Sequence, residues 1–165
     1  MRVRRRRPKR PAAVAAVDRA AIALGRGLVA GAAATAAMTV ASTAEMKLRR
    51  RPPSDAPAKV AGRLLGVKPR KKAGGRFAAV AHGATGVSLG ATRAAIDLAG
   101  VRGPAAPAAF FALAWTPDLV AVPAAGAAEP PWRWGAGEVA ISALHHVVYA
   151  AAGEGVYRAL SDGAA

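Results

Sequence analysis

The sequence is distinctive first for what it lacks: it contains no cysteine and few aromatic or acidic residues. The absence of cysteine excludes disulfide scaffolds, thiolate zinc sites and cysteine nucleophiles. Aromatic residues form only 5% of the 165 residues, so the apolar share of 53% consists mostly of alanine. This apolar share excludes disorder of the chain as a whole, and the length predicts one domain.

Acidic residues number 9 against 24 Lys and Arg, which gives a formal net charge of +15 and a pI near 11.7. The mean hydropathy is nevertheless +0.22. Basic nucleic-acid-binding proteins and membrane proteins are the two classes that fit, and the position of the charges separates them. Seven basic residues lie within residues 1–10 and eleven within 45–76, whereas the remaining segments are long and apolar. This separation favours a membrane protein.

Four apolar segments approach the length of about 20 residues that a helix needs to cross a bilayer. Residues 27–44 carry no charge, and residues 104–128 carry only Asp118. The first segment lacks the charged face that a soluble helix shows at the 3.6-residue period. We therefore predict an all-α, polytopic transmembrane helical bundle. Its four predicted spans are residues 22–44, 77–99, 104–126 and 136–160.

The proline positions and the segments outside the predicted spans predict helix breaks and a surface helix. A proline cluster that begins at Pro52 blocks continuation of the first helix. Residues 58–67 predict a short amphipathic helix on the membrane surface, and the prolines of the third span predict a kink near Asp118. The predicted organisation is a basic N-terminal arm (1–21), a membrane domain (22–160) that contains a basic loop (45–76), and a C-terminal tail (161–165).

The second and fourth predicted spans share a sequence pattern. His82 and His146 are each followed by a hydroxyl residue and then by Gly-x-x-Arg-Ala-x-x-Asp. One hypothesis is that the chain is a duplicated helical hairpin, since duplication is a common origin of membrane bundles. The alternative is a chance similarity in a sequence that is rich in Ala, Gly and Arg.

Ionisable residues inside a span are costly, so each of them suggests a role. The spacing of Glu138, His145 and Tyr149 places these three side chains on one face of the fourth span. Together with His82 they predict a buried polar site for proton or solute handling. The alternative is that they form hydrogen bonds between helices and only hold the bundle together. The candidate intramembrane polar residues are His82, Asp118, Glu138, His145, His146 and Tyr149.

Small residues and residues near the span ends predict how the helices pack and where the interfaces lie. Two Gly-x-x-x-Gly pairs favour a close approach of helix backbones, and they are Gly27 with Gly31 and Gly86 with Gly90. Arg93 with Asp97, and Arg158 with Asp162, are expected to pair four residues apart and to reach the interface. The predicted interface anchors are Arg93, Asp97, Trp132, Trp134 and Arg158.

The sequence contains no phosphate-binding loop, no dinucleotide fingerprint, and neither a Gly-x-Ser-x-Gly nor a His-Glu-x-x-His motif. We accordingly expect no enzymatic activity, no cofactor and no metal. The expected partners are the lipid bilayer, its anionic head groups and further copies of the chain, but not nucleic acid. A structural or accessory membrane protein without chemistry is one alternative. A soluble, alanine-rich protein that binds nucleic acid through phosphate contacts is the other.

Several motifs resemble those of small integral membrane proteins of high-GC actinobacteria, and more distantly those of YagU-like inner-membrane proteins. The resemblance covers residues 25–160. It implies a multi-pass protein of a bacterial plasma membrane without implying a reaction. The matching motifs are Ala30-Gly31-x-x-Ala34-Thr35-x-Ala37-Met38-Thr39, Arg51-Pro52-Pro53-Ser54-Asp55-Ala56-Pro57, Trp134-Gly135-x-x-Glu138 and Leu144-His145-His146-x-x-Tyr149.

Overall fold

The computed structural model describes residues 11–67 and 74–163, and all regular structure within these ranges is helical. The all-α prediction is therefore confirmed. Residues 1–10 of the predicted arm, 68–73 of the basic loop and the last two residues of the predicted tail lie outside the described residues. The elements are α1 (Ala12–Arg49), α2 (Ala56–Leu65), α3 (Gly74–Leu98), α4 (Ala105–Leu119), α5 (Ala121–Ala124), η2 (Pro131–Arg133) and α6 (Ala136–Asp162).

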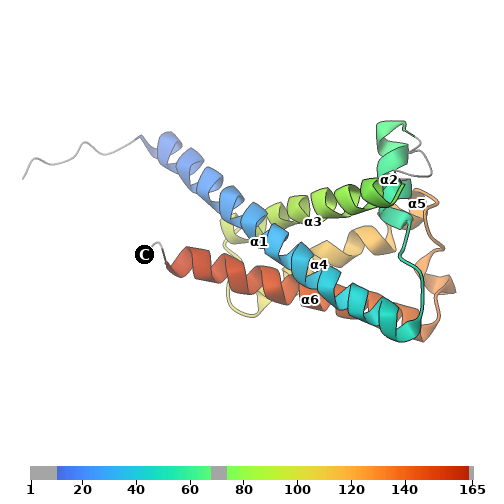
Figure 1. Ribbon diagram of the computed structural model, residues 1–165. Coiled ribbons are helices and arrows are strands. Elements are labelled where there is room, and N and C mark those ends of the chain that lie inside the picture. Colours follow the sequence, from blue (N-terminus) through green and yellow to red (C-terminus); the bar gives the residue numbers. More distant parts are fainter. Residues whose placement is uncertain (1–10, 68–73, 164–165) are drawn as a thin grey trace, which may run out of the picture.

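Four long helices run alternately in opposite directions along one axis (Figure 1). Helix α1 packs against both α3 and α6, while α4 packs against α6 and α3. One end of the bundle holds the start of α1, the turn between α3 and α4, and the end of α6 (Figure 1). We call it the terminal end. The opposite end, called the loop end, holds α2, α5 and η2 (Figure 1).

Two helical segments of the described chain are long and apolar enough to cross a membrane, α1 and Ala105–Ala124. Helices α3 and α6 have 25 and 27 residues and occupy the second and fourth predicted spans. These two helices are long enough to cross a membrane but not apolar enough, because they carry polar side chains. Among these side chains, Arg93, His146 and Glu154 are buried. The structure thus places a helix at each predicted span, and two of the four meet the criteria for crossing.

The helix ends follow from local sequence. Helix α4 contains Pro117 and stops at Leu119, because neither Pro117 nor Pro123 can donate the helical hydrogen bond and Pro123 leaves the Leu119 carbonyl oxygen without its donor. This break lies beside Asp118, where a kink was expected. At the end of α1, Arg50 has a positive φ of 53°, which turns the chain into the proline cluster. The amphipathic helix of the basic loop is α2, which begins two residues earlier than expected.

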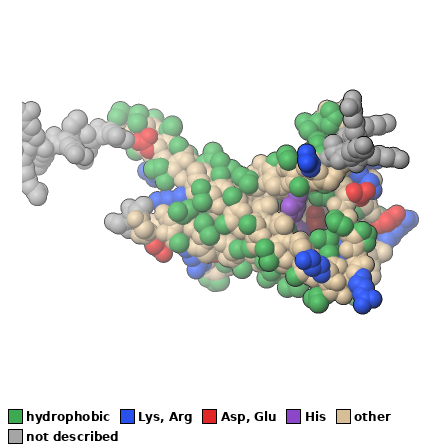
Figure 2. Space-filling view, in the orientation of Figure 1, with side chains coloured by type: hydrophobic (Ala, Val, Ile, Leu, Met, Phe, Trp, Pro, Cys, Tyr) green, Lys and Arg blue, Asp and Glu red, His purple; other side chains and the backbone are tan. Residues whose placement is uncertain are grey.

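The interior of the bundle consists mainly of small residues with a few aromatic rings, and most of its large aliphatic residues are exposed. Ala30, Ala34 and Phe110 are fully buried, and Tyr149 is 2% exposed. The exposed large residues on the four long helices include Ile22, Leu24, Leu28, Val29, Val40, Val80, Leu113, Leu144, Val147 and Leu160. Figure 2 shows apolar side chains across the middle of the visible face and charged side chains gathered toward the two ends.

Candidate functional site

A cluster of polar side chains lies between α4 and α6, in the half of the bundle nearer the loop end. The Asp118 carboxylate, at the end of α4, lies 3.9 Å from Nε2 of the buried His146. Ser142, one turn before His146 on α6, donates a hydrogen bond to Asp118 at 3.4 Å and accepts one from Trp115 Nε1 at 3.0 Å. Nδ1 of His146 lies 2.8 Å from the Ser142 carbonyl oxygen, which requires a proton on Nδ1. Nε2 is therefore the nitrogen that faces Asp118.

His82 joins this cluster from α3. Its Nε2 lies 3.4 Å from the Thr39 hydroxyl on α1, and Asp118 and His146 both act on it electrostatically. Figure 2 shows a histidine next to an acidic side chain in a recess of the visible face. We call His82, Asp118, Ser142 and His146 the histidine–aspartate cluster. The two histidines that the sequence pattern relates thus both lie near a single carboxylate.

The other expected members of the polar site lie elsewhere. Glu138 is half-exposed at the start of α6 and accepts a hydrogen bond from Arg49 at 2.9 Å, so the expected His82–Glu138 site does not form. Asp118 supplies the carboxylate instead, because the helix break brings the end of α4 against α6. The buried Tyr149 hydroxyl donates to the Gly86 carbonyl oxygen at 2.5 Å and joins α6 to α3.

His145 points toward the end of α1. The Glu45 and Arg51 charges both act on His145, whose Nε2 is buried without a hydrogen-bond partner. Arg51 donates to both oxygens of Glu45, from Nε at 2.8 and 3.0 Å and from a terminal nitrogen at 2.5 Å. This hydrogen bonding holds the pKa of the Glu45 carboxyl below its usual value. The contact fixes the chain as it leaves α1.

The glycine pairs lie at the crossing of α1 and α3. A Cβ atom on Gly90 would lie 2.1 Å from the Gly27 carbonyl oxygen, and one on Gly31 would lie 2.6 Å from the Val87 carbonyl oxygen. A Cβ on Gly86 would lie 2.1 Å from the Thr35 hydroxyl. The backbones therefore touch, as Gly-x-x-x-Gly spacing allows.

A second polar cluster joins α3 to α6 in the half nearer the terminal end. Arg93 and Glu154 are 5% and 6% exposed, and Nε of Arg93 donates to a Glu154 carboxylate oxygen. Another Arg93 nitrogen lies 3.3 Å from the second oxygen, to which Arg158 also donates at 2.6 Å. The Arg93 guanidinium lies 4.2 Å from the centre of the Tyr157 ring, a cation–π contact.

This second cluster corrects the expected pairing of Arg93 with Asp97 and of Arg158 with Asp162. Both arginines bind Glu154, and Asp97 pairs with Arg102 in the turn after α3. The reason is that the face of α3 that carries Arg93 packs into the bundle, so Arg93 is buried rather than placed at an interface. Glu154 was not among the predicted site residues. A lone acid in an apolar segment, four residues before an arginine, is the signal that could have identified it.

The two tryptophans lie at the loop end. Trp132 is 83% exposed, and Trp134 Nε1 donates to the Glu129 carbonyl oxygen at 2.7 Å. Arg133, between them, pairs with the Glu129 carboxylate at 3.1 Å. Local hydrogen bonds and an ion pair therefore hold the segment around η2 in place, and the Trp132 indole is exposed.

Within residues 11–67 and 74–163, no group of three or more His, Asp or Glu side chains has the geometry of a metal site. No family model, curated protein or solved structure matches the chain. The resemblance to the YagU-like proteins therefore stays a prediction, and function has to be argued from the geometry of the bundle.

Proposed function

We propose that the chain is a multi-pass protein of a bacterial plasma membrane, and that its histidine–aspartate cluster takes up and releases a proton. The membrane part of the proposal rests on the distribution of apolar side chains. Only 33% of the most apolar stretch of α1, and 17% of that in Ala105–Ala124, is buried in the protein. A soluble bundle buries most of its large aliphatic residues, whereas this bundle leaves most of them exposed and buries mainly alanine and glycine, a few aromatic rings and an ion pair.

The dimensions of α1 support this proposal. Its uncharged run, residues 27–44, has a length of about 27 Å at the helical rise, close to the apolar thickness of about 30 Å of a bilayer. Arg26 precedes this run and Glu45 follows it. The charged side chains of α1 thus lie at the depths where a membrane meets water.

Extraction of membranes at alkaline pH tests the membrane proposal. We expect the full-length chain to stay in the pellet after a carbonate wash and to dissolve only in detergent. Release into the wash, or release by salt alone, would show a peripheral or soluble protein. Retention of DNA by the released protein would then support the nucleic-acid alternative.

The proton-handling role is supported by the arrangement around Asp118. Its side chain is 45% exposed and lies 3.9 Å from the buried His146. Histidine is the side chain whose unperturbed pKa places its change of charge between pH 5 and 8. Asp118 therefore connects the buried imidazole to the surroundings, while Ser142 and Thr39 orient the polar groups around it.

Asp118→Asn tests this role. We expect the Asp118→Asn chain, purified in nanodiscs and followed from pH 8 to pH 5 with an indicator dye, to take up fewer protons than the original chain. The physical reason is the loss of a negative charge beside two imidazoles.

The matched control is Asp162→Asn, which removes an exposed aspartate at the other end of α6 and should leave the uptake curve unchanged. An Asp118→Asn curve equal to that of the original chain would contradict the proposal. It would leave the cluster with a packing role, as in the structural alternative.

A further inference from the structure

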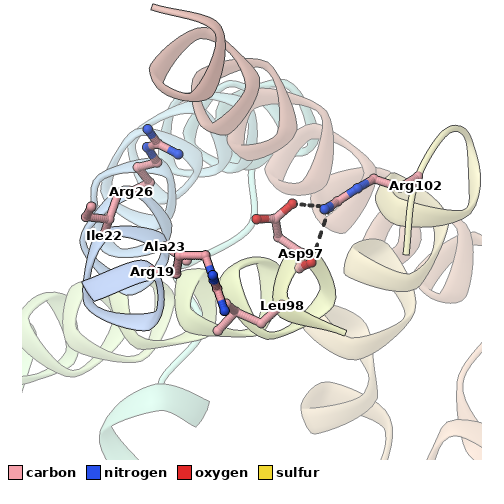
Figure 3. Close-up of a pocket in the computed structure, with 7 residues that line it drawn as sticks. All are labelled: Arg19, Ile22, Ala23, Arg26, Asp97, Leu98 and Arg102. Atoms are coloured by element: carbon pink, nitrogen blue, oxygen red, sulfur yellow. Dashed lines mark hydrogen bonds and ion pairs between the residues drawn. The ribbon is translucent and has the colours of Figure 1, made fainter. Parts of the chain in front are cut away.

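A pocket of about 350 Å³ lies at the terminal end, between the first half of α1 and the end of α3. Figure 3 shows Arg19 extending toward Leu98, Arg26 extending toward the opposite side, and Ala23 between them on α1. The Asp97 carboxylate faces this space and binds Arg102, which follows α3 (Figure 3). The lining residues are Arg19, Ile22, Ala23, Arg26, Asp97, Leu98 and Arg102.

The pocket carries an excess of positive charge. Arg102 is neutralised by Asp97, but neither Arg19 nor Arg26 forms an ion pair with a carboxylate of the described residues. The lining thus carries three arginines against one aspartate, with Arg19 and Arg26 on either side of Ala23. Guanidinium groups bind phosphate oxygens through several hydrogen bonds at once, which makes a phosphate group a suitable occupant.

The depth and the apolar lining of the pocket favour a lipid over a free phosphate ion. Arg26 immediately precedes the uncharged run of α1, so the pocket lies at the level of lipid head groups if α1 crosses the bilayer. Ile22 and Leu98 are both more than half exposed beside the charged groups. A free phosphate ion would leave these aliphatic side chains uncovered, whereas the glycerol and acyl chains of a lipid would cover them.

We propose that this pocket binds an anionic phospholipid by its phosphate, with Arg19 and Arg26 as the phosphate ligands and Ile22 and Leu98 against the acyl region. The proposal rests on the membrane location proposed above. Basic pockets between membrane helices are a known form of lipid recognition, and each basic residue near a membrane surface contributes appreciably to binding. Asp97 holds Arg102 at the rim of the pocket.

The test is a lipid titration of the full chain in detergent micelles, followed by its thermal unfolding midpoint. We expect dioleoyl phosphatidylglycerol to raise the midpoint saturably, and dioleoyl phosphatidylcholine and inorganic phosphate to leave it unchanged. Arg19→Gln combined with Arg26→Gln should weaken phosphatidylglycerol binding about 30-fold.

The control is Arg50→Gln combined with Arg133→Gln, which removes the same charge at the loop end and should retain full binding. Equal weakening in this control would show general charge attraction and overturn the proposal. An equal midpoint shift with inorganic phosphate would overturn the lipid assignment. If the carbonate wash retains the chain while phosphatidylglycerol has no effect, only the pocket proposal fails; release into the wash removes the membrane location on which it rests.

Discussion

Replacement of Gly90 by alanine is expected to destabilise the bundle by about 3 kcal/mol or more. The added Cβ would lie 2.1 Å from the Gly27 carbonyl oxygen and 2.8 Å from Gly31 Cα, which are backbone atoms that cannot rotate away. Helices α1 and α3 would have to separate, and the contacts along their whole crossing would be lost. The free energy of unfolding, measured by titration with sodium dodecyl sulfate in mixed micelles, gives the size of this effect.

Gly83→Ala is the matched control, because Gly83 is also in α3 but has no neighbouring atom within 4 Å of an added Cβ. There the substitution should stabilise the protein by about 0.5–1 kcal/mol, since alanine favours the helix over glycine. A Gly90→Ala protein as stable as the Gly83→Ala protein would show that the two helices do not meet at Gly90.

The second large effect is expected at the buried ion pair. Glu154→Ala would leave the Arg93 guanidinium buried at 5% exposure without its carboxylate, which costs about 3–5 kcal/mol. The same titration measures the loss. One nitrogen of Arg93 already lacks a hydrogen-bond partner, so the site has no spare acceptor to replace Glu154.

Two further variants separate loss of charge balance from loss of packing. Arg158→Gln removes a half-exposed partner of Glu154 and should cost no more than about 1 kcal/mol. Arg93→Leu combined with Glu154→Leu removes both buried charges and should recover most of the stability lost in Glu154→Ala. If the double variant is as unstable as Glu154→Ala, uncompensated charge is not the cause.

The positions of the helices were predictable from the sequence because they depend on local features. Uncharged runs, the proline cluster after α1 and Pro117 within α4 determine where helices begin, end and break. The rotation of each helix about its axis was not predictable, because it depends on which faces pack together. The expected pairing of Arg93 with Asp97 used only neighbours within one helix, whereas its partner lies 61 positions away on α6.

The candidate site was also predictable only in part: the sequence showed which residues are unusual, but not how they pair. The sequence indicated that His82, His146 and Asp118 are unusual in apolar segments, and the structure brings these three together. It did not indicate that Asp118 rather than Glu138 would be the acid, since that follows from where α4 breaks against α6. Ser142 and Trp115 carried no signal, because hydroxyl and indole groups are common in helices of both soluble and membrane proteins.

Phe110 divides the interior into two separate compartments. Its ring fills the space left by Gly153, where an added Cβ would lie 2.8 Å from the ring, and Ala34 and Tyr149 complete a dry layer around it. The histidine–aspartate cluster lies on one side of this layer, and the Arg93–Glu154 pair lies on the other. Among the described residues no side-chain hydrogen bond joins the two clusters across this layer, so under the proposed function a proton on Asp118 would not pass to Glu154 through protein side chains.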